Sequence, residues 1–122
     1  MRHPTLFRAT RLLLTVAVSG IAFLAVPEAD AAAATVGIVE REPDNAASWG
    51  YEPADITVPA GSTVTWEWRG KDKHSATADN GAFDSGVKQG VGQKWTFTFS
   101  NPGQYPYSCT PHPFMTGTVT VT

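Results

Sequence analysis

Residues 107–115 read Tyr107-Ser108-Cys109-Thr110-Pro111-His112-Pro113-Phe114-Met115. This stretch contains the only cysteine of the chain, one of its three histidines and one of its two methionines. Cys109, His112 and Met115 follow one another at intervals of three residues, so a thiolate, an imidazole and a thioether lie on one short loop. Such a mixture of soft and borderline donors is typical of a transition-metal site.

One more imidazole would complete this set of donors. His74 is the only other histidine beyond the first few residues of the chain. Two imidazoles and a thiolate in a trigonal arrangement, with a weak axial thioether, form the ligand set of a blue-copper electron-transfer centre. We therefore predict that four side chains bind one copper ion, which cycles between Cu(II) and Cu(I): His74, Cys109, His112 and Met115.

The N-terminal segment has the pattern of a secretory signal peptide. Positive side chains precede an apolar run over residues 12–26, and Ala29-Asp30-Ala31 has the small residues of a cleavage site. We expect residues 1–31 to be removed and residues 32–122 to form the mature domain, with an uncleaved N-terminal anchor as the alternative. The protein would then be exported and act in the periplasm or outside the cell. No later run is long and apolar enough to span a membrane, so none is expected in the mature form.

Charge and cysteine content limit the possible partners of the mature domain. Three of the nine basic residues and two of the eleven acidic residues precede residue 32, so six basic and nine acidic residues remain. This slightly acidic balance does not indicate binding to nucleic acid or to an anionic membrane. A single cysteine cannot form an internal disulfide, which suggests another role for the thiol of an exported protein. We expect a monomer.

Alternating apolar and polar residues predict an all-β fold. Residues 63–68 alternate strictly, and residues 95–99 repeat the pattern before a turn signal. No ten-residue stretch has helical periodicity. Short alternating strands at this spacing predict an antiparallel sandwich. The other expected strands cover residues 35–39, 56–58, 105–109 and 117–122.

Two details of the chain add to this prediction. Residues 40–54 are polar and contain Trp49 and Tyr51, so we expect a loop held in place by aromatic side chains. Pro106 interrupts the expected strand over residues 105–109. Because proline cannot donate to a ladder of hydrogen bonds, it marks a sheet edge or a bulge.

The sequence from Ile56 to Val121 resembles the cupredoxins, the plastocyanin-like blue copper proteins, and the loop over residues 109–115 is most similar to that of amicyanin. The segment over residues 59–66, the strand ending at Phe99 and the pattern Pro-Gly-x-Tyr-x-Tyr-x-Cys carry the rest of the similarity. The resemblance implies a two-sheet Greek-key sandwich, one mononuclear copper and the role of a small electron carrier.

By position, the resemblance implies that His74 and His112 are imidazole ligands, Cys109 the thiolate ligand and Met115 the axial ligand. The family commonly has an asparagine directly after the first histidine, which ties the two ligand loops together. Ser75 stands at this position, and we expect its side chain to hydrogen-bond toward Thr110.

His112 lies among apolar residues, which indicates a contact surface for redox protein partners. We expect docking at the patch formed by Pro111, His112, Pro113 and Phe114. Pro111 also has no backbone N–H to donate to the sulfur of Cys109. Fewer donors to the sulfur should favour Cu(II) and lower the reduction potential.

Other classes of function remain to be weighed against electron transfer. The main alternative is a copper-binding or delivery module without a physiological redox partner. A cysteine-dependent hydrolase is disfavoured because no oxyanion-hole motif surrounds Cys109, so we do not expect an enzyme. Structural zinc seldom accepts a thioether. Two histidines in the mature chain are too few for a multicopper oxidase.

Overall fold

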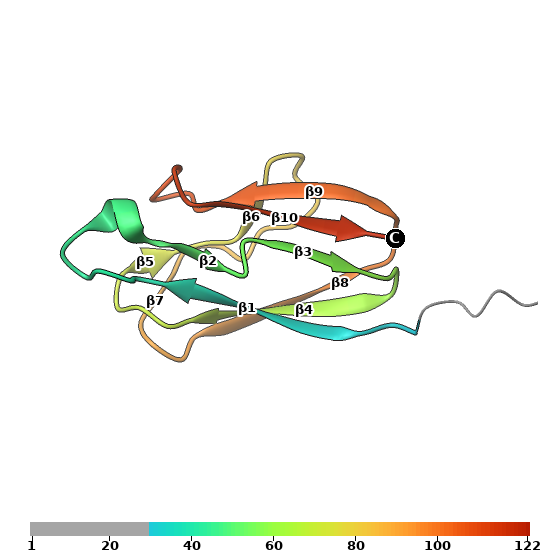
Figure 1. The fold of residues 1–122 in the computed structure, drawn as a ribbon, viewed down its shortest axis with the longest axis horizontal. Coiled ribbons are helices and arrows are strands. Elements are labelled where there is room, and N and C mark those ends of the chain that lie inside the picture. Colours follow the sequence, from blue (N-terminus) through green and yellow to red (C-terminus); the bar gives the residue numbers. More distant parts are fainter. Residues whose placement is uncertain (1–29) are drawn as a thin grey trace, which may run out of the picture.

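A computed structural model describes residues 30–122 of the chain (Figure 1). The expected signal peptide therefore lies outside the described residues, apart from its last two positions. Within residues 30–122, no helix has the length and apolar character of a membrane span. The described chain contains strands and one short 3-10 helix, in the order β1 (Ala33–Val39), η1 (Ala46–Ser48), β2 (Gly50–Glu52), β3 (Asp55–Val58), β4 (Ser62–Trp68), β5 (Lys73–His74), β6 (Thr77–Ala78), β7 (Lys88–Gln89), β8 (Lys94–Phe99), β9 (Gly103–Ser108) and β10 (Thr116–Val121).

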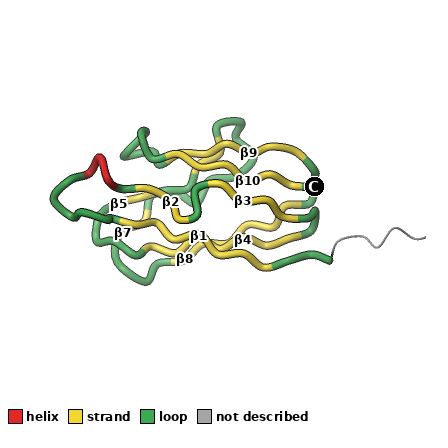
Figure 2. Tube along the Cα trace, in the orientation of Figure 1, coloured by secondary structure: helices red, strands yellow, loops and turns green. Residues whose placement is uncertain are grey.

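The strands form two four-stranded sheets that face each other, which confirms the expected all-β sandwich (Figure 2). One sheet has the order β2-β1-β4-β8, and the other has the order β3-β10-β9-β6. Strands β5 and β7 pair in a separate two-stranded sheet. Each large sheet contains one parallel pair, β1 with β4 and β3 with β10, beside its antiparallel pairs. A parallel pair needs a crossover connection, and between β1 and β4 the chain passes through the second sheet as β3.

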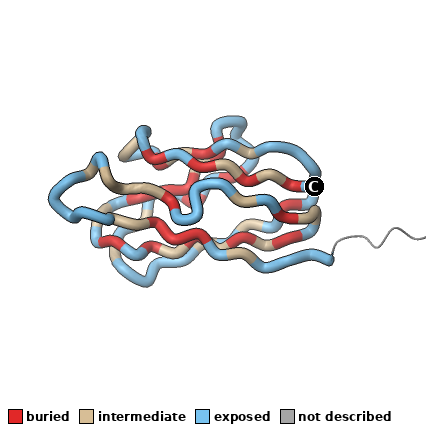
Figure 3. Tube along the Cα trace, in the orientation of Figure 1, coloured by how far each residue is buried: buried red, intermediate tan, exposed pale blue. Residues whose placement is uncertain are grey.

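The core lies between the two sheets and consists largely of aromatic rings. On β4, Val64, Trp66 and Trp68 are all fully buried, as the alternation predicts. On β10, Val119 and Val121 are buried, while Thr118 and Thr120, which alternate with them, are half-buried. Figure 3 shows buried residues recurring along the strands, with exposed residues concentrated in the connecting loops.

Edge positions explain two features of the sequence. Strand β8 ends its sheet, so Trp95 and Phe97 are only half-buried although they follow the same alternation as the buried Phe99. Strand β6 pairs with Tyr107 and Ser108 of β9, and its Thr77 also forms an isolated bridge with Asp84. Pro106 accepts a hydrogen bond from the N–H of Asp79 just beyond that pairing, at 2.9 Å, and its missing N–H falls where the ladder ends.

The segment over residues 40–54 differs in part from the expected loop. Residues 50–52 form β2, which pairs antiparallel with β1 through Ile38 and Tyr51. Tyr51 is 2% exposed, so the aromatic side chain does hold this segment on the core. The preceding residues 40–49 form a loop with one 3-10 turn, at the same end of the sandwich as β5, β7 and the β9–β10 connection and away from the C-terminus (Figure 1).

Replacing Trp66 by alanine should destabilise the whole domain. The Trp66 ring has its centroid 5.2 Å from that of Phe83 and 5.5 Å from that of Tyr107, and it is fully buried. Removing a buried tryptophan leaves a cavity and typically costs about 3–5 kcal/mol. Chemical denaturation followed by far-UV circular dichroism measures this loss. Val91→Ala is the control, because Val91 is 67% exposed and its loss should change stability by no more than about 0.5 kcal/mol. Equal losses in the two variants would contradict the core described above.

Candidate metal centre

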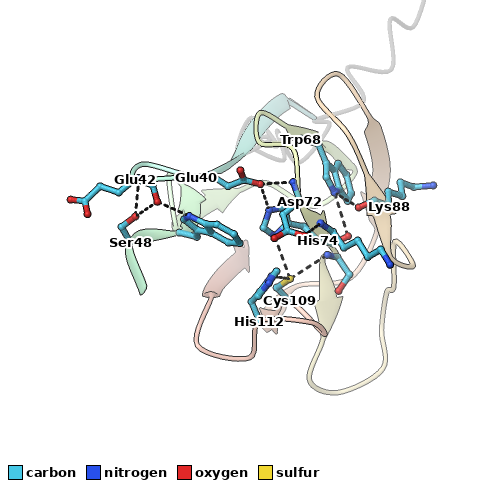
Figure 4. Close-up of polar contacts among 12 residues, drawn as sticks. Glu40, Glu42, Ser48, Trp68, Asp72, His74, Lys88, Cys109 and His112 are labelled. Atoms are coloured by element: carbon cyan, nitrogen blue, oxygen red, sulfur yellow. Dashed lines mark hydrogen bonds and ion pairs between the residues drawn. The ribbon is translucent and has the colours of Figure 1, made fainter. Parts of the chain in front are cut away.

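His74 is held rigidly at the end of the sandwich. It is the second residue of β5, where it pairs with Lys88 of β7, and its side chain is fully buried. The indole N–H of Trp68 donates to the backbone oxygens of both residues, at 3.3 Å to His74 and 3.0 Å to Lys88. Trp68 of β4 thus holds the backbone that carries the imidazole (Figure 4).

Backbone hydrogen bonds close the loop that carries the other three predicted ligands. The N–H of Cys109 donates to the oxygen of Met115 at 3.1 Å, and the N–H of Met115 donates to the oxygen of His112 at 2.9 Å. The N–H of His112 donates back to the oxygen of Cys109 at 3.2 Å. The backbone of each of these three residues is therefore hydrogen-bonded to the backbone of the other two. Cys109 and Met115 are buried, whereas His112 is partly exposed.

The structure brings three of the four predicted ligands together at their donor atoms. One donor atom each from His74, Cys109 and His112 lies within 4.8 Å of the others. The Sγ of Cys109 is 3.7 Å from Nδ1 of His74 and 3.6 Å from Nδ1 of His112 (Figure 4). Sulfur and nitrogen donors bind a first-row metal at about 2.0–2.3 Å, so in a trigonal plane they stand roughly 3.5–4 Å apart. The spacing of the donors therefore fits one ion, and Met115 adds a buried thioether on the same loop.

Ser75 connects the two segments that carry these donors. Its backbone N–H points to the Sγ of Cys109 at 3.4 Å. Its Oγ accepts the backbone N–H of Thr110 at 2.8 Å, and lies 3.0 Å from Thr110 Oγ1. The expected hydrogen bond from Ser75 toward Thr110 is confirmed. The hydroxyl of Tyr51 donates to the Ser75 oxygen at 2.5 Å, which also ties β2 to the site.

The environment of the thiol favours a metal ligand over a nucleophile. Burial raises the pKa of Cys109, and the N–H of Ser75 acts in the opposite direction without cancelling the effect. A catalytic cysteine needs a lowered pKa. A bound metal ion would supply a positive charge that stabilises the thiolate at this position.

Sequence reasoning missed the role of Glu40. Its Oε1 accepts the backbone N–H of Asp72 at 2.7 Å and lies 2.9 Å from Nε2 of His74 (Figure 4). The side chain is 8% exposed. Burial alone would raise the pKa of this carboxyl, but the hydrogen bonds from Asp72 and His74 outweigh it and place the pKa below its ordinary value. No signal near Glu40 in the sequence points to His74, which lies 34 residues further along the chain.

Sequence reasoning assigned Trp49 only a structural role in its loop. The Trp49 ring packs edge-on against both predicted histidine ligands, with centroid distances of 5.6 Å to His74 and 5.1 Å to His112. Its indole N–H donates to the backbone oxygen of Glu42 at 3.0 Å. The aromatic residue that fixes the loop thereby also covers the two imidazoles.

Comparison with known proteins agrees with this geometry. Residues 39–122 match the profile of the copper binding proteins of the plastocyanin/azurin family. Amicyanin of Paracoccus denitrificans is 37% identical over 75 residues, which cover 58% of this chain and 57% of that protein. Amicyanin-alpha of Methylorubrum extorquens is 32% identical over 114 residues, which cover 88% of this chain and 87% of that protein. The chain thus spans somewhat more than half of the first relative and most of the second.

Solved structures share the fold. A purple cupredoxin from Nitrosopumilus maritimus superposes with a TM-score of 0.64 at 29% identity, over 73% of this chain and 99% of that one. The reduced Cu(I) form of an amicyanin variant superposes with a TM-score of 0.58 at 33% identity, over 74% of this chain and 82% of that one.

Removing the Ser75 hydroxyl should loosen the loop of residues 109–115. In Ser75→Ala the amide of Thr110 loses its acceptor, and leaving such a group unsatisfied costs about 1–3 kcal/mol. Native-state hydrogen exchange should show faster exchange at the Thr110 amide, together with reduced stability on denaturation. Ser100→Ala, at an exposed serine, is the control. Unchanged protection of the Thr110 amide in Ser75→Ala would show that Ser75 does not hold the loop.

Proposed function

Because the chain belongs to the plastocyanin/azurin family of copper binding proteins, we propose that it is a type 1 copper protein that carries single electrons between extracytoplasmic redox partners. The observation that carries this proposal is the convergence of one thiol and two imidazoles within 4.8 Å, from two segments far apart in sequence. Amicyanins are among its relatives, and a cupredoxin is among its structural neighbours.

Each predicted ligand has a distinct part in this function. Nδ1 of His74, Sγ of Cys109 and Nδ1 of His112 would hold the copper ion, and the thioether of Met115 would serve as a weaker fourth ligand. Bound copper supplies a one-electron couple, Cu(II)/Cu(I). The protein residues hold the donors in place through Ser75 and the closed loop, so that little rearrangement accompanies a change of charge. With every donor position taken by the protein, we propose a carrier and not an enzyme.

His112 is the proposed point of electron entry and exit. Its imidazole is the partly exposed one of the pair, and it packs against Phe114 with a centroid distance of 5.9 Å. Phe114 is 54% exposed, and Pro111 and Pro113 are exposed on either side of His112. Exposed apolar side chains of this kind support docking of redox proteins through a small interface.

We further propose that residues 1–31 are a cleaved signal peptide and that residues 32–122 are the mature, monomeric protein in the periplasm or outside the cell. The support is the order of positive residues, apolar run and small residues in the N-terminal segment. Intact-mass measurement of the exported protein tests the cleavage site, and a mass that includes the first residues would contradict it.

Loading the mature protein with one equivalent of Cu(II) should give an intense blue colour. The expected absorption arises from a thiolate bound to Cu(II), bleaches with ascorbate and returns on reoxidation. Absorption and electron paramagnetic resonance spectra measure it, and Cys109→Ser should remove the band. A colourless or pale product from the unaltered protein would contradict electron carriage and favour copper delivery.

Replacing Pro111 by alanine should raise the reduction potential. Ser75 already supplies one backbone N–H to the Sγ of Cys109, at 3.4 Å, and Pro111 has none to add. A new N–H directed at the sulfur would stabilise the electron-rich Cu(I) form. Redox titration of the visible band measures the shift, with Pro113→Ala as the control on the same loop. A potential that stays unchanged or falls in Pro111→Ala would contradict this prediction.

A further inference from the structure

The Glu40 carboxylate reaches the buried histidine from a different part of the fold. Glu40 directly follows β1, whereas His74 belongs to β5 in the separate two-stranded sheet. The distance from Oε1 to Nε2 of His74 is 2.9 Å, and neither side chain has appreciable contact with solvent. The backbone N–H of Asp72 donates to the same oxygen at 2.7 Å, which fixes the carboxylate (Figure 4).

This contact determines which nitrogen of His74 carries the proton. An ionised carboxylate only accepts hydrogen bonds, so Nε2 must donate. In a neutral imidazole the other nitrogen, Nδ1, then has a free lone pair. Nδ1 is the atom that faces the Sγ of Cys109 at 3.7 Å. The protein thus holds His74 in the tautomer that a metal requires at this position.

Gly70 leaves room for the side chain of Glu40. A Cβ at Gly70 would overlap the carboxyl group and the Cγ of Glu40. Gly70 does not have a positive φ, so its lack of a side chain is explained by this close approach and not by backbone conformation. The loop between β4 and β5 is therefore shaped to admit the carboxylate.

We propose that Glu40 is a positioning residue of the copper site, which orients His74 and adds an anionic partner to its imidazole. The effect of Glu40 on copper rests on the proposed function, whereas its effect on the His74 tautomer is independent of that function. A hydrogen-bonded carboxylate strengthens the imidazole as a donor. The Glu40 carboxylate therefore favours Cu(II) over Cu(I) and lowers the reduction potential.

The first test uses the metal-free protein. Nitrogen-15 NMR of the histidine side chains should show His74 protonated at Nε2, with a slowly exchanging proton. In Glu40→Ala that proton should exchange rapidly, whereas in Glu40→Gln the amide oxygen can still accept it and protection should remain. Protonation at Nδ1 in the unaltered protein, or equal exchange in Glu40→Ala, would overturn the proposal whether or not the protein binds copper.

The second test uses competition with a chelator for Cu(II) and redox titration of the loaded protein. Loss of a partner of a metal-bound histidine typically lowers metal affinity roughly 10- to 100-fold, and we expect this for Glu40→Ala. Glu40→Gln should raise the reduction potential because it removes the charge but keeps an acceptor. Glu42→Gln makes the same change in net charge at an exposed residue two positions away and should leave both quantities unchanged. Equal effects of Glu40→Gln and Glu42→Gln on the potential would overturn the anionic role.

Gly70→Ala provides an independent variant in which Glu40 keeps its charge. The added methyl group should displace the carboxylate and weaken Cu(II) binding in the same direction as Glu40→Ala. In a Glu40→Ala background the same substitution should have little further effect, because the atoms it displaces are gone. Additive effects of the two substitutions would show that Gly70 does not act through Glu40.

Discussion

The candidate site depends on the hydrogen bonds of one buried serine. Ser75 follows one predicted ligand, His74, and bonds to the loop that carries the other three through Cys109 and Thr110. The backbone oxygen of Ser75 accepts a hydrogen bond from the hydroxyl of Tyr51, so β2 is attached to the same residue. A serine is shorter than the asparagine common at this position in the family. The Ser75 hydroxyl nevertheless accepts a hydrogen bond from the backbone N–H of Thr110, so this shorter side chain still connects the two segments.

The parts of the structure that follow from local pattern could be predicted from the sequence. Strict alternation along residues 63–68 identified a strand whose buried face includes Trp66, because side-chain direction in a strand depends only on residue parity. The spacing of Cys109, His112 and Met115 predicted that the three residues share one tight loop, and backbone hydrogen bonds close this loop in the structure. The parallel pairs were not predicted, since alternation does not tell which strand lies beside which.

The parts that depend on long-range contact could not be predicted. Nothing in the residues around Glu40 distinguishes it from the other acids of a polar loop, and its partners lie 32 and 34 residues further along the chain. Trp49 was expected to hold the loop, but its contacts with His74 and His112 join segments that lie far apart in the sequence. Those contacts exist only once the sheets are assembled.

The sequence separations within the site limit how it can form. His74 and Cys109 are 35 residues apart, and Glu40 precedes His74 by 34, so one loop alone holds none of these pairs. Bringing together segments this far apart costs conformational entropy, which the packing of the two sheets must offset. A metal ion held by these donors would bind the folded chain in preference to the unfolded one, and it would therefore raise the free energy of unfolding.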